Sequence, residues 1–468
     1  MKPRFAKIAR IAAKMVAGLL AFVLLLVLVW TLINSFDTSL GEQAKALLTP
    51  PPNPYPTSEN LYLAMAGLEG AGERPIVEMG QERIAAYNQA LNAMRLESEV
   101  ALELNKQWEA GKLKFNGNAE WGSSRTSSIW TISKSHRQEI TALLTSNQRL
   151  YLRYLSLHHL HGYYETVRPS PMAPLVVVPQ PLRTLFLADV ANRIQSGTLQ
   201  QQREALFDLQ RDLQMWQTVL KGDGTLISKM LAAAYLHGDL ILLADFITDP
   251  SSNVNSLDEA LGPLSLPFDP KDFRIGNAFA AEFRVSASVY ETITAPNEMA
   301  GSMASSNWWN RVGNALGAHF FKPNATENMA AAIAAQRIEL GNSDPARFNL
   351  NLAAYVEWLD RNEPHLAPAF LYNPIGKILV KLAVPSNDGY YLRAYDVAAY
   401  QRLVYLAYQL KHQHIATADV PAFLNAHPNW STHPVDGKPF RWNPETAELT
   451  VNTLGEDTRG RRFSVTLR

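Results

Sequence analysis

An uncharged stretch of nineteen residues near the N-terminus, residues 15–33, constrains this chain more than any other feature. At 1.5 Å of rise per residue it would form about 28 Å of helix, close to the thickness of a bilayer core. The hydrophobic region of a cleaved signal peptide is shorter, about 7 to 15 residues, and precedes a small-residue cleavage site. Here the stretch ends with Trp30, an aromatic residue of the kind found at membrane interfaces. We therefore predict an uncleaved transmembrane signal anchor at residues 15–34.

The basic residues are distributed unevenly along the chain. Lys+Arg and Asp+Glu are equal, at 43 each, but the first 14 residues carry five basic side chains and no acidic one. Positive charges beside a membrane span stay in the cytoplasm, so we expect residues 1–14 there and the rest of the chain on the other side. For a bacterial inner membrane, that side is the periplasm. The balanced total charge also argues against a nucleic-acid partner, because no excess of positive charge is available to neutralise phosphates.

Proline clusters predict the organisation of the remaining chain. Residues 49–56 (TPPPNPYP) contain five prolines and should be extended, so we interpret 35–56 as a Pro-rich spacer that holds the domain off the membrane. An α-helical extracytoplasmic domain then follows at 57–425. Two further proline-rich passages, 168–181 and 262–270, mark places where this domain could be subdivided.

The hydrophobic pattern predicts a mainly α fold with a small C-terminal antiparallel β meander. Apolar residues recur at helical spacing from Leu199 to Leu220, and Gly222 then ends the predicted helix. Residues 226–247 are apolar enough to cross a membrane, but they include Lys and Asp, so we interpret them as a buried helix. Polar and apolar residues alternate near the C-terminus, which predicts two or three short strands within 426–468.

Three short segments resemble uncharacterised single-pass envelope proteins of proteobacteria. They are residues 320–326 (FFKPNAT), 373–377 (NPIGK) and 436–440 (DGKPF). The resemblance implies an inner-membrane location and assigns no activity and no residue role.

One constellation suggests a metal site. His158, His161 and Glu165 are separated by three and four residues, which would place them on one face of a helix. Two imidazoles and a carboxylate form a reasonable ligand set for zinc or iron. The alternative is that His158 continues an apolar stripe into the core while His161 faces solvent. No fourth ligand can be identified, so no cofactor is predicted.

Aromatic residues suggest a partner surface. Trp308 and Trp309 with Arg311 could form a docking element, and Tyr391 and Tyr395 could offer rings to a glycan or peptide. Core packing explains both groups equally well, because aromatic stripes on helices are usually buried.

The chain lacks the short motifs of common hydrolases and nucleotide-binding enzymes, which favours a non-enzyme. We therefore expect a membrane-anchored periplasmic scaffold or assembly factor of the bacterial envelope with a protein partner. A membrane-tethered periplasmic hydrolase that uses the His/Glu group is the first alternative. A glycan-binding module is the second.

Overall fold

The computed structural model describes residues 2–92, 97–119, 128–294, 317, 319–362, 371–383, 388–455 and 462–467. The chain forms two compact units. Unit 1 comprises residues 1–49, 283–335 and 356–385, and unit 2 comprises residues 50–282, 336–355 and 386–468. The predicted subdivision near 168–181 and 262–270 does not coincide with this division, because both passages lie inside unit 2.

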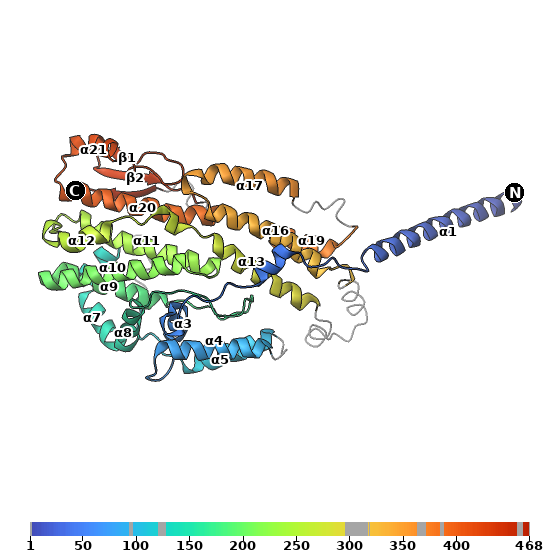
Figure 1. Ribbon diagram of the computed structural model, residues 1–468, viewed down its shortest axis with the longest axis horizontal. Coiled ribbons are helices and arrows are strands. Elements are labelled where there is room, and N and C mark those ends of the chain that lie inside the picture. The colour runs from blue at the N-terminus through green and yellow to red at the C-terminus, as the bar shows by residue number, and fades with distance from the viewer. Residues whose placement is uncertain are drawn as a thin grey trace. The chain divides into compact units, whose positions relative to one another are not determined.

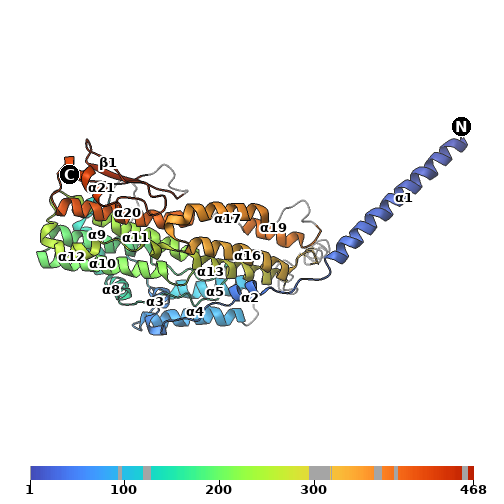
Figure 2. The same cartoon turned by 45° about the horizontal axis from the view of Figure 1, so that its top comes forward.

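The mainly helical fold is confirmed. Unit 2 holds α3 (Leu61–Gly67), α4 (Ile76–Asn92), α5 (Glu97–Gly111), α6 (Ile129–Ser135), α7 (Arg137–Ser146), α8 (Gln148–Leu157), α9 (Gln180–Ser196), α10 (Leu199–Lys221), α11 (Leu226–Thr248), α12 (Asp258–Ser265), α20 (Asp388–His412) and α21 (Val420–Ala426). The helices α13 (Gly276–Thr294), α16 (Pro323–Asn342) and α17 (Phe348–Asn362) contribute residues to both units. Figures 1 and 2 show α10, α11 and α20 side by side, and α11 contacts both of the others.

The sequence explains where α10 begins and ends. Thr198 accepts a hydrogen bond from the Gln201 backbone, and the Gln201 side chain accepts one from Thr198 N, so the pair forms a capping box. The apolar stripe is buried from Leu206 onward, including Leu213 and Trp216, whereas Leu199 is exposed. Gly222 follows the last helical residue, as predicted.

The predicted buried helix is α11. More than half of its most apolar stretch is buried, as expected for a core helix of a folded domain. This helix is also long and apolar enough to cross a membrane, so burial rather than hydropathy distinguishes it from the N-terminal helix α1 (Lys2–Ile33).

The predicted C-terminal meander is confirmed as a three-stranded antiparallel sheet of β1 (Arg441–Asn443), β2 (Glu448–Asn452) and β3 (Arg462–Thr466), in the order β1-β2-β3. Leu449 pairs with Val465, and both are buried. Asp396 of α20 accepts hydrogen bonds from Leu454 N at 2.8 Å and Gly455 N at 2.9 Å, just after β2. The carboxylate therefore fixes the sheet to α20.

Unit 1 contains α1, α2 (Glu42–Leu48), α19 (Pro374–Ala383) and parts of α13, α16 and α17. Residues 13–33 of α1 are long and apolar enough to cross a membrane, and their window is 0% buried. Figure 1 draws α1 as one uninterrupted helix. Residues 13–29 of this helix are exposed, and exposure of so many apolar side chains is unfavourable in water.

Residues 35–56, predicted to be a Pro-rich spacer, include a short helix and make contacts with folded parts of the chain. Residues 42–48 form α2, whose Ala44 is buried against Phe283, Ala331 and Ala334 of unit 1. Within unit 2, Tyr164 Oη donates a hydrogen bond to Pro51 O at 2.6 Å. Proline content predicted an extended conformation, but it carries no information about which residues this segment contacts.

Candidate functional site

The predicted metal ligands are not brought together on a helix. The helix α8 ends at Leu157, so His158 caps it and His161 and Glu165 lie beyond it. His158 is buried, with Nε2 2.9 Å from Asp212 Oδ1, whereas His161 is exposed. No group of three His, Asp or Glu residues suited to a metal ion occurs among the described residues. The spacing argument failed because it assumed that the helix continues.

Glu165 belongs to a different group of side chains. Its Oε1 accepts hydrogen bonds from Tyr163 Oη at 3.0 Å, Thr225 Oγ1 at 3.2 Å and Ser228 Oγ at 2.5 Å. The carboxylate thus connects the segment after α8 to the first turn of α11. In this arrangement Glu165 is a hydrogen-bond acceptor that holds two segments of the fold together.

The predicted aromatic partner surface is buried where it can be described. Tyr391 and Tyr395 are each only 1% exposed. Tyr391 Oη donates to Arg337 O at 2.9 Å, and burial raises the pKa of Tyr395 to about 12. Neither ring can stack on a glycan without unfolding of its surroundings. Trp308, Trp309 and Arg311 lie outside the described residues.

The structure instead gathers polar residues around the end of α1. We call residues 34–41, 319–328 and 371–377, all of unit 1, the collar. At its centre, Asn34 is fully buried, donates from Nδ2 to Leu371 O at 2.7 Å and accepts at Oδ1 from Asn373 N at 2.9 Å. These two asparagines are 339 residues apart in the sequence. Two hydrogen bonds from one buried amide fix the position of the chain as it leaves α1.

Asn373 extends this connection to α16 and α19. Its Oδ1 accepts from Lys322 N at 2.8 Å and Gly376 N at 3.2 Å, and its Nδ2 donates to Thr326 Oγ1 at 3.0 Å. Its φ of 49° lies in the left-handed region, which asparagine tolerates better than most residues.

Glycine is required at position 376. A Cβ atom there would lie 1.9 Å from Thr326 Oγ1 and 2.4 Å from the side-chain amide of Asn373. The close approach of α19 to this amide therefore depends on the absence of a side chain.

The first turns of α16 hold residues 37–41. Asp37 accepts from Asn324 N at 2.8 Å and Ala325 N at 3.1 Å, so a carboxylate from a distant segment caps the positive end of α16. Asn328 accepts from Gly41 N at 2.7 Å and donates to Ser39 O at 3.0 Å. The chain that leaves α1 is therefore bound along its length before α2 begins.

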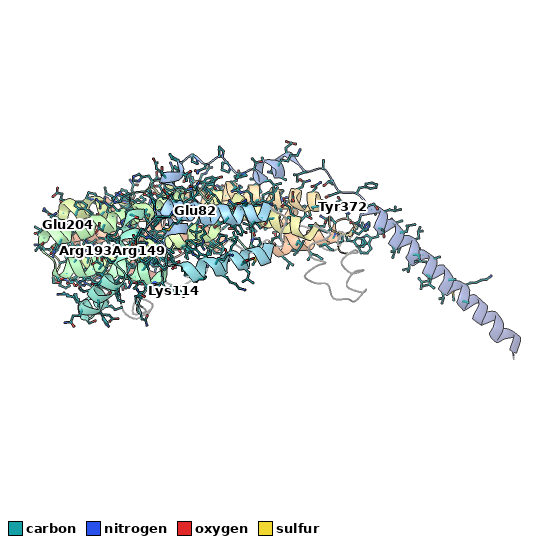
Figure 3. All side chains as sticks on the ribbon, turned by 90° about the horizontal axis from the view of Figure 1, so that it is seen from below. Glu82, Lys114, Arg149, Arg193, Glu204 and Tyr372 are labelled. Carbon is teal, nitrogen blue, oxygen red and sulfur yellow. The ribbon has the colours of Figure 1, made fainter. Side chains whose placement is uncertain are left out.

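A cavity of about 270 Å³ lies in the collar. Its lining residues are Thr38, Ala325, Asn328, Met329, Tyr372, Asn373 and Lys377. Figure 3 shows Tyr372 close to the end of α1. Burial lowers the pKa of Lys377. The mixture of apolar, amide and ammonium groups would suit a small amphipathic group.

A second polar cluster lies in the core of unit 2. Asp212 on α10 accepts from Tyr154 Oη at 2.6 Å, and its Oδ2 lies 2.9 Å from Arg183 Nη1. Arg183 also pairs with Asp239 of α11. Burial would raise the pKa of Asp212, but Arg183 and its hydrogen-bond donors outweigh burial, so the net pKa is lowered.

This core cluster is closed to solvent. The side chains of Arg183, His158 and the two aspartates are at most 2% exposed. Burial raises the pKa of Asp239 well above its ordinary value, although Arg183 opposes this. A substrate could not reach these groups in the folded unit, so the cluster is a structural connection between α8, α9, α10 and α11.

The other polar residues of α11 also pair with neighbouring elements. Lys229 donates from Nζ to Val219 O at 2.9 Å and to Gly222 O, so its ammonium group satisfies carbonyls at the end of α10. Burial lowers the pKa of Lys229 to about 8. His237 packs against the rings of Tyr400 and Phe463, and burial lowers its pKa to about 4.

Asp245 gives a pH-dependent prediction. Burial raises its pKa from 3.8 to about 6, so the folded unit favours the neutral acid. The stability that this acid contributes is therefore fully present below pH 3.8 and is lost as the pH rises through 6. At neutral pH the ionised form costs about 3 kcal/mol at 1.36 kcal/mol per pKa unit. We expect Asp245→Asn to raise the thermal unfolding temperature at pH 7.5 and to have little effect at pH 4, with exposed Asp419→Asn as the control. An equal effect at both pH values would contradict this.

No known protein family matches the chain, and no similar curated protein or solved structure was found.

Proposed function

We propose that this protein is a single-pass, membrane-anchored scaffold or assembly factor of the bacterial cell envelope that acts through protein–protein contacts. In this proposal α1 crosses the inner membrane with the basic N-terminus in the cytoplasm, and both folded units lie in the periplasm. The support is a helical segment of 21 residues that is long and apolar enough to span a bilayer, preceded by basic residues.

The observation that carries the proposal is the way the collar binds the end of α1. An anchor that only has to retain a protein at a membrane can be joined to it by a flexible linker. Here Asn34 is buried and hydrogen-bonded to both Leu371 and Asn373, and Asp37 caps α16. Burying an amide is costly unless its hydrogen bonds are satisfied, so such a joint is worthwhile where the orientation of the folded unit to the membrane matters. That requirement is typical of a scaffold.

The arrangement of the predicted site residues favours the scaffold over its alternatives. The hydrolase hypothesis needs His158, His161 and Glu165 at one site, and the first is buried against Asp212 while the second faces solvent. The glycan-binding hypothesis needs exposed rings, and Tyr391 and Tyr395 are buried.

The proposal is tested by crosslinking in living cells. We expect the full chain to be recovered with one defined envelope complex, and a reporter fused after Arg468 to be active only outside the cytoplasm. Recovery without any protein partner under several crosslinkers of different reach would contradict the scaffold. A reporter active only in the cytoplasm would contradict the orientation.

A matched variant sharpens the crosslinking test. Gly376→Ala should distort the collar because the new methyl group meets Thr326 and Asn373. Gly111→Ala introduces the same methyl group where no atom lies within 4 Å. We expect the first variant to reduce recovery of the complex severalfold and the second to leave it unchanged, at equal protein levels.

A further inference from the structure

The collar reaches back onto the last turn of α1. The ring of Trp30 stacks on Phe320 with centroids 4.0 Å apart, and His319 Nε2 lies 3.0 Å from Thr31 O. Both α1 residues belong to the apolar segment that ends at Ile33. Two residues from a distant part of unit 1 therefore lie at the depth of the segment rather than beyond it.

The length of the apolar segment determines the depth in the bilayer at which this contact lies. Its 21 residues give about 31 Å of helix, and a bilayer core is about 30 Å thick. If the final turn stood in water, the remaining helix would be too short to span the core without thinning the bilayer. The final turn, and the collar residues that contact it, then lie at the membrane interface.

Two exposed apolar side chains flank the same point. Phe36 is 80% exposed and Leu371 is 60% exposed, and the carbonyl of Leu371 is bound to Asn34. In water this exposure is unfavourable, whereas large apolar and aromatic side chains are favoured in the interfacial region of a bilayer.

We propose that the collar lies in the headgroup region of the bilayer, with the side chains of Phe36 and Leu371 against lipid. This inference rests on the proposed anchoring by α1. The segment around Leu371 then provides a second membrane contact, 335 residues distant from Phe36 in the chain. Two contacts restrict tilting of the rest of unit 1 relative to the bilayer surface, which a single helix does not.

The test uses the full chain, which contains no cysteine, so single thiols can be labelled without interference. A small environment-sensitive fluorophore is attached at Leu371→Cys or Phe36→Cys, and the protein is reconstituted in phosphatidylcholine–phosphatidylglycerol vesicles. Lipids brominated near the headgroup quench labels in the interfacial region, lipids brominated deep in the acyl chains quench labels such as that at Leu24, and iodide quenches from water. Leu24→Cys, within α1, reports anchoring, and Glu42→Cys, on an exposed side chain of α2, reports the aqueous phase.

We expect brominated lipid to quench the labels at both collar positions roughly threefold or more above the Glu42 label, with weak quenching by iodide. Quenching of Leu371 by iodide alone, with Leu24 quenched by lipid, would overturn the collar inference and leave the anchor intact. Protection of Leu371 from both quenchers would also overturn it, since a protein would then cover this face. Failure of lipid to quench Leu24 would overturn the anchor itself.

Discussion

Replacing Asn373 with alanine is expected to destabilise unit 1 by about 3–6 kcal/mol. The change leaves the buried N–H groups of Lys322 and Gly376 without their acceptor and removes the donor to Thr326. Each buried group left unsatisfied costs about 1–3 kcal/mol, and alanine adds about 1 kcal/mol of strain at a φ of 49°. Hydrogen exchange read by mass spectrometry on the full chain should show faster exchange in α16 and α19.

Three further variants identify the cause of this loss. Asn373→Gly tolerates the positive φ but has no amide, so it should lose nearly as much stability as alanine. Asn373→Asp keeps the acceptor and should lose less. Asn362→Ala, at an exposed asparagine of the same unit, should change little. If Asn373→Gly restored full protection, backbone strain rather than the hydrogen bonds would explain the effect.

Replacing Arg183 with methionine is expected to destabilise unit 2 by about 3–5 kcal/mol at pH 7, because it leaves two buried carboxylates without their cation. Asp212 and Asp239 both pair with this guanidinium, and neither side chain is exposed. Their pKa values should rise in the variant, so the stability that it retains is greatest at low pH and falls as the pH rises. Chemical denaturation of the full chain across pH 5–8 measures this.

Charge and packing can be separated in the same series. The double variant Arg183→Met/Asp239→Asn removes one of the stranded carboxylates and should recover part of the loss. Arg211→Met on α10 removes a guanidinium that is half exposed and 3.5 Å from Asp208, and should cost less than about 1 kcal/mol. A loss in Arg183→Met that did not vary with pH would mean that lost packing, and not charge, is responsible.

Sequence pattern predicted the parts of the fold that depend on local periodicity. The stripe from Leu199 to Leu220 predicted α10, and alternation predicted β2 and β3. The predicted helical positions of the histidines were wrong because the helix was assumed to continue beyond its actual C-terminus. The helix that was to carry His161 and Glu165 ends at Leu157.

The collar could not be predicted from sequence because its contacts join segments that are about 50 to 340 positions apart. Asn34, Asp37 and Asn373 look like ordinary loop residues, since periodicity reports burial of apolar side chains and is silent about polar partners. Residues 320–326 and 373–377 stood out by their resemblance to envelope proteins, but nothing in either segment indicated that the two would meet. The buried cluster of Arg183 was missed for the same reason.

The most direct test of the joint between α1 and the rest of unit 1 is disulfide formation between Gly41→Cys and Asn328→Cys in isolated membranes. A Cβ atom at Gly41 would lie 3.6 Å from Asn328 Cγ, which places the two Cβ atoms within about 5 Å, near the range of a disulfide. Ala335→Cys lies two turns further along α16, about 10 Å away, and serves as the mismatched partner. We expect mild oxidation to protect both thiols of the 41/328 pair from alkylation and to leave the 41/335 pair reactive. Free thiols at 41 and 328 in a folded, membrane-embedded chain would show that α1 is only tethered to the rest of unit 1, and would contradict the proposed scaffold.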